Sequence, residues 1–200
     1  MKSNNRVVAA FDFDGTITTR DTFLPFLIRA CGRARVYAVL LRLGGEALRV
    51  WLGRSDRDRF KVLLLRRLLA GAAVANLMKS GIEHAKFILP WCRPAALERI
   101  RWHQEQGHRL VMVSASLNFY LEAVAAQLGF EDVLCTEMLA VEGVCSGELK
   151  GENCRAAEKV KRLQGLLGAL ESCEIYAYGD SDGDTEMLAS ADHPAFRPFC

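Results

Sequence analysis

The sequence predicts an α/β fold in which a parallel sheet, covered by helices, is interrupted by one long helical insertion. An apolar strand-like segment at 7–11 ends in two carboxylates and a glycine. Residues 21–89 repeat apolar side chains at three-to-four spacing, which is typical of helices. Beyond Pro90, strand-like and helix-like segments alternate, which is typical of a parallel sheet with helices on its faces. We therefore assign 1–18 and 90–200 to the core and 19–89 to the insertion.

The elements follow in order from local signals. In the insertion, helical periodicity covers the stretches 23–30, 35–52, 60–79 and 81–89. Pro25 suits a first helical turn, and Gly44-Gly45 is expected to interrupt or bend the second stretch. In the core we expect helices at 94–105, 117–128, 156–167 and 185–189, strands at 110–113, 133–136 and 175–178, and a hairpin across 139–151.

Composition is that of a soluble globular chain of 200 residues, half of them apolar and a quarter charged. The first six residues are not followed by a signal-peptide type of apolar segment, and no apolar run approaches the length needed to span a bilayer. None of the seven cysteines forms a C-x-x-C pair, so neither a zinc site nor a redox motif is indicated. We expect a cytoplasmic protein whose cysteines are mostly buried and reduced.

The charges are unevenly distributed along the chain. Residues 29–109 hold 17 Lys or Arg against 6 Asp or Glu, whereas residues 110–200 hold 6 against 15. Two interpretations stay open: an anionic substrate that meets a cation-binding core, or a merely solvated basic surface. The basic residues are interleaved with leucines and no recognition motif is present, so no nucleic-acid partner is expected. Peripheral contact with a membrane surface and the oligomeric state stay open.

Polar side chains cluster where the predicted strands end. Asp12 and Asp14 are two residues apart on extended chain, so they can share one side of the strand end, where two like charges need a cation or a shared proton. Ser114-Ala115-Ser116 follows the strand at 110–113 and offers backbone N–H groups before a helix, which suits a phosphate. The run Gly179–Asp184 follows the strand at 175–178, and position twelve counted from Asp180 is Ala191, which excludes an EF-hand.

Taken together, the motifs FDFDGT at 11–16, VMVSAS at 111–116, Lys159 in AEKVKRL and YGDSDGD at 178–184 resemble the haloacid dehalogenase (HAD) superfamily. The resemblance covers essentially the whole chain and points to the branch with a helical cap between the first two motifs, which includes phosphoserine phosphatase and bacterial phosphatidylglycerophosphate phosphatases. It implies a Rossmann-like parallel sheet core with an inserted α-helical cap, and a phosphate-ester substrate.

The resemblance also implies a mechanism. Asp12 would be the nucleophile that forms an aspartyl-phosphate, and Asp14 would protonate the leaving alcohol and then activate water. Mg²⁺ would be held by the carboxylates of Asp12 and Asp180 and by the backbone carbonyl of Asp14. Asp14 also favours phosphate-ester chemistry over halide chemistry, because a halide leaving group needs no acid.

The resemblance also implies supporting roles for other residues. Ser114, the Ala115 N–H and Lys159 would bind the phosphoryl oxygens, and Asp184 would hold the metal's water shell or position Lys159. Gly15 and Thr16 shape the loop that follows the nucleophile. Arg155 lies one helical turn before Lys159, so the sequence leaves open which of the two is the cation of this motif. The chemistry needs no histidine, and the four histidines are expected to be structural.

The sequence leaves alternatives open for both the substrate and the outcome of the reaction. The insertion is rich in Leu and Arg and offers Phe23, Phe26, Trp51 and Phe60, which favours a lipid-linked or otherwise amphipathic phosphate over a small one such as phosphoserine. A phosphotransferase or mutase that passes the phosphoryl group to a second substrate is one alternative function. A catalytically silent binding protein with the same fold is the other.

Overall fold

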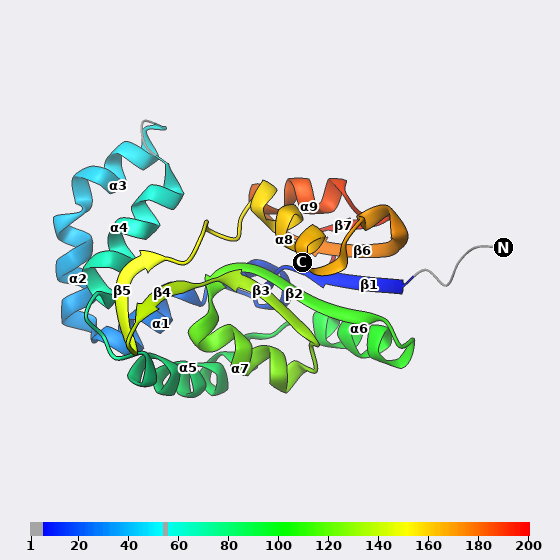
Figure 1. Ribbon diagram of the computed structural model, residues 1–200, viewed down its shortest axis with the longest axis horizontal. Helices are drawn as coiled ribbons and strands as arrows, with labels where there is room; N and C mark the ends of the chain where they lie inside the picture. The colour runs from blue at the N-terminus through cyan, green and yellow to red at the C-terminus, as the bar shows by residue number, and fades with distance from the viewer. Residues whose placement is uncertain (1–5, 54–55) are drawn as a thin grey trace.

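The computed structural model describes residues 6–53 and 56–200, with a parallel sheet at its centre (Figure 1). The first residues of the segment considered as a signal peptide, 1–5, lie outside the described part. The sheet has the strand order β3-β2-β1-β6-β7, and every neighbouring pair is parallel. Its strands are β1 (Arg6–Phe11), β2 (Arg109–Leu117), β3 (Asp132–Thr136), β6 (Cys173–Gly179) and β7 (His193–Phe196). The expected fold class is confirmed, and only the short edge strand β7 was not anticipated.

Helices cover both faces of the sheet. α6 (Pro94–Glu105) and α7 (Asn118–Leu128) lie below the sheet in Figure 1, and α8 (Ala157–Leu167) and α9 (Thr185–Ala189) lie above it. Because successive strand residues point to opposite faces, Val8 and Ala10 of β1 enter one core and Ala9 and Phe11 enter the other. All four are fully buried, which explains the unbroken apolar run of this strand.

The strand order reverses beside β1. From β1 the chain builds β2 and β3 on one side, and then crosses to build β6 and β7 on the other. In a parallel sheet such a reversal leaves a crevice beyond the carboxyl ends of the two strands that flank it. The two strands are β1 and β6, and the segments that follow them carry the carboxylates singled out in the sequence.

Among the described residues, five α-helices lie between β1 and the core helix α6. They are α1 (Phe23–Cys31), α2 (Arg33–Arg42), α3 (Gly44–Trp51), α4 (Arg57–Leu69) and α5 (Val74–Ile88). The interruption expected at Gly44-Gly45 falls at Leu43, just before them. The stretch 60–79, expected as one helix, is divided between α4 and α5 because Gly71 adopts φ +81° and its N–H donates to the Cys145 carbonyl at 2.9 Å.

The expected hairpin is present and contacts the insertion. β4 (Met138–Val141) and β5 (Val144–Leu149) pair antiparallel. The Cys145 N–H donates to the Ala72 carbonyl at 2.8 Å. Together with the bond from the Gly71 N–H to the Cys145 carbonyl, it forms a reciprocal pair of backbone hydrogen bonds. A segment of the carboxyl-terminal half therefore fastens the turn between α4 and α5.

Most of the cysteines are buried, as expected. All seven thiols are free, and five of them are buried: Cys92, Cys135, Cys145, Cys154 and Cys173. None of the helices in the described part combines the length and the apolar character that crossing a membrane requires.

The insertion packs directly on the core through α5 and α7. A Cβ atom at Gly81 of α5 would lie 1.8 Å from the backbone oxygen of Phe119 in α7, far inside van der Waals contact. The missing side chain therefore lets the two helix backbones approach closely.

We predict that Gly81→Ala lowers the free energy of unfolding by about 1–3 kcal/mol, because relieving the overlap must separate the helices. This loss outweighs the gain of up to about 1 kcal/mol that alanine brings inside a helix. Urea denaturation measures the change. Gly165→Ala is the matched control, since no atom lies within 4 Å of a Cβ at this exposed position in α8, and it should be neutral or stabilising. Equal behaviour of the two variants would contradict the close approach.

His84 is a buried neutral histidine at the same junction. Its Nε2 lies 3.0 Å from the Thr22 carbonyl, so this nitrogen carries the proton, and its Nδ1 has no partner among the described residues. Its ring lies against Tyr120 and Phe26. Burial lowers the pKa of His84 from 6.5 to about 4, with the Thr22 carbonyl raising it and Arg29 lowering it further.

This depressed pKa predicts acid destabilisation. The unfolded chain binds the proton near pH 6.5 and the folded chain only near pH 4, so stability falls as the pH drops between these values. From pH 7 to pH 5 we expect His84 to cost about 2 kcal/mol, measured by urea denaturation. Because burial also lowers the pKa of His103 to about 4, the comparison must be with His84→Gln. Parallel pH profiles of the wild type and this variant would rule out the assignment to His84.

Candidate active site

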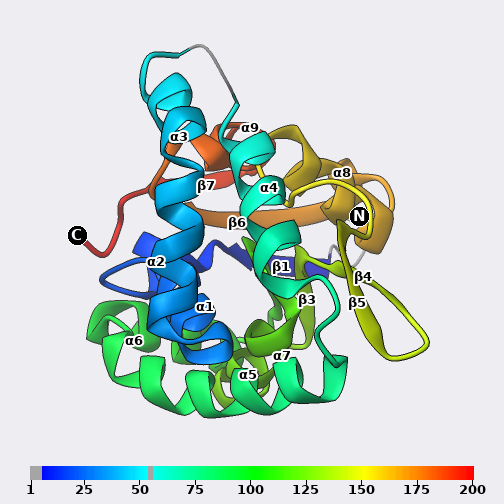
Figure 2. The same ribbon diagram turned by 90° about the vertical axis from the view of Figure 1, so that its left-hand side faces the viewer.

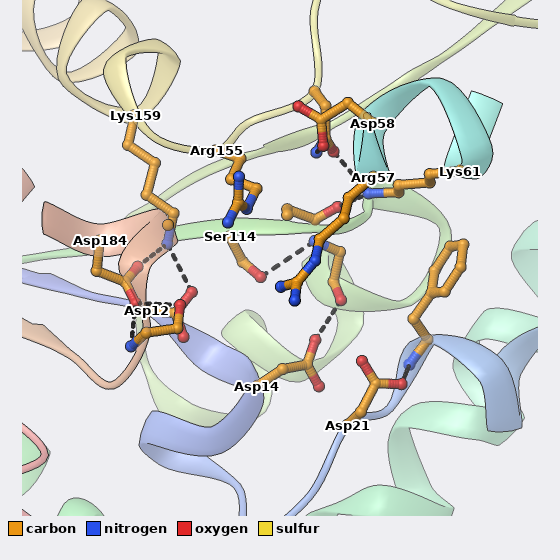
Figure 3. A pocket seen from close by; sticks show the side chains of 16 residues that line it. Asp12, Asp14, Asp21, Arg57, Asp58, Lys61, Ser114, Arg155, Lys159 and Asp184 are labelled. Carbon is orange, nitrogen blue, oxygen red and sulfur yellow. Dashed lines mark hydrogen bonds and ion pairs between the residues drawn. The ribbon is translucent and has the colours of Figure 1, made fainter. Parts of the chain in front are cut away.

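A pocket of about 240 Å³ opens between the carboxyl ends of the sheet strands and the insertion (Figure 3). Its walls come from the segments after β1 and β6, from the end of β2, from the start of α8, and from α1 and α4. Sixteen residues line it: Asp12, Asp14, Asp21, Phe23, Arg57, Asp58, Lys61, Ser114, Ala115, Ser116, Asn153, Arg155, Lys159, Ser181, Gly183 and Asp184. The fold thus brings together the polar strand ends identified in the sequence.

Three carboxylates converge at the crevice beside β1. Asp12 directly follows β1, and its N–H donates to the Tyr178 carbonyl of β6 at 2.9 Å, so sheet pairing fixes its backbone. Asp180 directly follows β6, and Asp184 ends the turn after it. One oxygen from each of Asp12, Asp180 and Asp184 lies within 4.8 Å of the others. Hard oxygen ligands at this spacing suit a divalent cation such as Mg²⁺.

Lys159 reaches this cluster from α8. Its Nζ donates to Asp12 Oδ1 and Asp184 Oδ1, both at 2.6 Å, and to the Val113 carbonyl of β2 at 2.8 Å. The lysine is buried, and all three of its protons are used. Of the two cations that the sequence left open, Lys159 is the one that contacts Asp12, whereas Arg155 lines the pocket beside Gly183.

Asp184 holds the acidic turn together. Its Oδ2 accepts the N–H of Asp180 at 3.2 Å, and both the N–H and the hydroxyl of Ser181 at 3.0 and 2.9 Å. Burial acts to raise the pKa of Asp184, but Lys159 and these donors outweigh burial and lower it. Asp184 is therefore ionised, and it both orients the ammonium of Lys159 and fixes the backbone of Asp180.

The cluster carries excess negative charge. Burial raises the pKa of Asp12 to about 7, although the ammonium of Lys159 opposes this effect. Burial and the charge of Asp184 also raise the pKa of Asp180. A single ammonium thus leaves these carboxylates incompletely compensated, and a bound cation would restore the balance. The donor set therefore fits a divalent metal.

Asp14 lies apart from the metal-type cluster. Its carboxylate accepts the N–H and the hydroxyl of Thr22, at 2.7 and 2.6 Å, and also the hydroxyl of Ser116. Burial, helped by the charge of Asp21, raises its pKa to about 6. This value suits a carboxyl group that gives and takes a proton near neutral pH.

The loop after Asp12 approaches the other acidic strand end closely. Gly15 adopts φ +85°, and a Cβ there would lie 2.4 Å from Asp180 Oδ2. The hydroxyl of Thr16 donates to Asp180 Oδ1 at 3.3 Å. Both residues therefore shape the loop, and glycine is required at position 15 for its conformation as well as for space.

The serine segment expected to follow a strand lines the pocket, but it lies within β2, which runs further than expected. β2 continues to Leu117 with an irregular pairing between Ser114 and Leu117, and α7 begins at Asn118. The Ser116 N–H donates to Ser114 Oγ at 3.1 Å, so the segment closes on itself within the strand end. Ser114 and Ala115 lie at the pocket wall as expected.

The contribution of α4 to the pocket was not anticipated from the sequence. Lys61 donates to the Ala115 carbonyl and to Asn153 Oδ1, the latter at 2.6 Å, and the Asn153 amide donates to Asp58 Oδ1 at 2.7 Å. Burial lowers the pKa of Lys61 to about 8, although nearby carboxylates oppose the shift. Arg57 also points into the pocket (Figure 3). The i, i+4 spacing of Arg57 and Lys61 was a signal, but only packing shows which face of α4 meets the core.

The aromatic residues of the insertion are placed differently from one another. Phe23 lines the pocket, with its ring 5.1 Å from Lys61 Nζ. Phe26 is fully buried in the core, and Phe60 packs against that core. The side chain of Trp51 lies outside the described part.

Known proteins resemble this chain over nearly its whole length. It is 36% identical to Protein CicA of Caulobacter vibrioides over 195 residues, which cover 96% of this chain and 86% of that protein. It is 29% identical to a protein of Mycobacterium tuberculosis named as a probable phosphatase, over 94% of this chain and 67% of that protein.

Solved structures share the fold. A protein of unknown function from Bordetella pertussis aligns with a TM-score of 0.79 at 23% identity, over 94% of this chain and 87% of the other. A phospho-aspartyl intermediate analogue of phosphoserine phosphatase aligns with a TM-score of 0.61 at 19% identity, over 94% and 84%. The family model for haloacid dehalogenase-like hydrolases matches residues 9–189, a span that contains every carboxylate of the pocket. The chain belongs to the haloacid dehalogenase-like hydrolase family.

Proposed function

We propose that this chain is a phosphomonoesterase in which Asp12 is the nucleophile. The observation that carries the proposal is the 2.6 Å contact between Lys159 Nζ and Asp12 Oδ1 at the crevice of the sheet. An ammonium at this distance favours the ionised, nucleophilic form of the carboxylate. The similarity to a protein named as a probable phosphatase supports the same reaction class.

The proposed chemistry uses the two aspartates in sequence. An oxygen of Asp12 attacks phosphorus to form an aspartyl-phosphate, while the bond between phosphorus and the leaving oxygen breaks and Asp14 gives that oxygen a proton. Asp14, now ionised, takes a proton from water, whose oxygen attacks phosphorus and releases phosphate from Asp12. The raised pKa of Asp14, about 6, suits both proton transfers.

Ser114 and the Ala115 N–H would bind the phosphoryl oxygens, and the charge of Lys159 would stabilise them from beside Asp12. Phosphoryl transfer depends mainly on positioning and electrostatic stabilisation, which these groups would supply at the pocket wall. Asp12, Asp180 and the backbone carbonyl of Asp14 would hold Mg²⁺. When bound, the ion neutralises charge on the phosphoryl oxygens and keeps Asp12 ionised beside them.

The pocket favours a polar substrate. It is small, and its lining is almost entirely charged or hydrogen-bonding, with Phe23 as its large apolar side chain. The apolar character of the insertion, which favoured a lipid-linked ester, belongs largely to buried residues such as Phe26. We therefore propose that the site accepts a small phosphate ester or the polar head group of a larger one, with any acyl chains outside.

Two alternatives use the same residues. A phosphotransferase would pass the phosphoryl group from Asp12 to an alcohol, and product analysis with added alcohols would then give a new ester in place of phosphate. A catalytically silent protein would turn over no phosphate ester.

We predict that the wild type hydrolyses p-nitrophenyl phosphate with Mg²⁺ and that EDTA abolishes the activity. Asp12→Asn removes the nucleophile and should reduce kcat by about 10³-fold or more. The matched control is Asp182→Asn, which alters an exposed carboxylate of the same acidic turn and should leave kcat within about twofold. Turnover that survives in Asp12→Asn, or that ignores EDTA, would refute the proposed mechanism.

Lys61 is proposed as a positioning residue that holds α4 against the end of β2. Lys61→Met leaves the Ala115 carbonyl and Asn153 without this partner, so we expect kcat/KM to fall by about 10–100-fold. The exposed residue Lys79 in α5 provides the control, and Lys79→Met should retain wild-type kinetics. If Lys61→Met also retained them, Lys61 would have no positioning role.

A further inference from the structure

The outer face of α2 and α3 carries a line of exposed apolar side chains. Tyr37, Leu41, Leu48 and Leu52 are 43%, 82%, 54% and 49% exposed. Single exposed apolar residues are ordinary on protein surfaces, but a line of four along neighbouring helices is a patch. We call these four residues the apolar line.

The apolar line points directly away from the core. The two helices are almost continuous, because the Leu43 N–H donates to the Val39 carbonyl and the Ala47 N–H donates to the Leu43 carbonyl, at 3.0 and 2.9 Å. The spacings of four, seven and four residues place the line within about 60° around such a helix. Val36, Val39 and Leu43, on the opposite side, are buried. These helices are therefore apolar on two opposite faces, and packing within the chain explains only one.

Arginines flank the apolar line. Residues 33–53 contain Arg33, Arg35, Arg42 and Arg49 but only one acidic residue, Glu46. Glu46 is half-buried and pairs with Arg49 at 3.5 Å and with Arg59 at 3.7 Å. The same stretch contains no Asn, Gln, Ser, Thr or His. It can therefore offer positive charge and apolar contact, but almost no directional hydrogen bonding besides that of arginine.

The position of these helices suits contact with an extended surface. α2 and α3 form the outer edge of the molecule in Figure 1 and face the viewer in Figure 2. A convex ridge of this kind can lie on a planar partner without a complementary groove. A second copy of the chain would bring two rows of arginines together, which like-charge repulsion disfavours.

We propose that the outer face of α2 and α3 binds the surface of an anionic lipid bilayer. The arginines would contact lipid phosphates, and the side chains of the apolar line would enter the boundary between head groups and acyl chains. The face is separate from the pocket residues, so the proposal does not depend on the proposed reaction.

Cosedimentation with vesicles tests the proposal. Vesicles of equal parts phosphatidylglycerol and phosphatidylcholine should bind the protein at low salt, and vesicles of phosphatidylcholine alone should not. Raising the ionic strength to about 0.5 M should release it, because salt screens exposed charges. Absence of binding to the anionic vesicles at low salt, or equal binding to both compositions, would overturn the proposal.

Variants separate this face from the rest of the insertion. Leu41→Ser and Arg42→Gln should each weaken vesicle binding about fivefold, since each removes one apolar or one charged contact. Ile82→Ser is the control, because Ile82 is an exposed aliphatic residue on α5, away from the apolar line, and it should bind like the wild type. Equal loss in Leu41→Ser and Ile82→Ser would contradict a specific face.

Two further readouts distinguish other outcomes. Hydrolysis of p-nitrophenyl phosphate in solution should be unchanged in Leu41→Ser and Arg42→Gln, so a failed vesicle experiment leaves the proposed function standing. Light scattering without lipid reports the oligomeric state. A dimer that Leu41→Ser converts to a monomer would assign the face to contact between copies and overturn the lipid proposal.

Discussion

The architecture of the site depends on the ion pairs between the ammonium of Lys159 and the carboxylates of Asp12 and Asp184. The ammonium lies buried between Asp12 and Asp184 and also binds a backbone carbonyl of β2, so it joins three sheet strands and the helix α8 at one point. Burying several carboxylates without a cation would cost far more free energy than a small domain has to spare. The same ammonium therefore stabilises the fold and, in the mechanism that we propose, favours the ionised form of Asp12.

The site is divided into two electrostatic halves. The core contributes the carboxylates that suit a metal, and α4 contributes Arg57 and Lys61 from the opposite wall. This arrangement agrees with the uneven charge of the sequence, a basic first half and an acidic second half. A phosphate ester between the two halves would meet positive charge on the side of the insertion and a cation held by the core on the other.

The insertion is integrated into the core instead of standing away from it. α5 packs on α7 through Gly81, the hairpin β4–β5 bonds to the turn before α5, and Lys61 bonds to the end of β2. The pocket wall that the insertion provides is therefore held by contacts from several distant parts of the chain. The outer face of α2 and α3, by contrast, keeps an apolar line that no packing among the described residues covers.

The sequence by itself determined the strand-end chemistry and the element order. Asp12, Asp14, Ser114 and Asp180 each follow an apolar strand, and parallel strands end at one edge, so their meeting is a local consequence of pattern and topology. Contacts made at long sequence separation were beyond it. Packing of helices and strands decides the contact of Lys159 with Asp12 and that of Lys61 with the Ala115 carbonyl. It also decides the division between α4 and α5 and the presence of the edge strand β7. Periodicity in the sequence reveals a helix, but it does not reveal what each face of that helix packs against. Tertiary structure decided those, because burial and pairing energies are properties of the assembled chain.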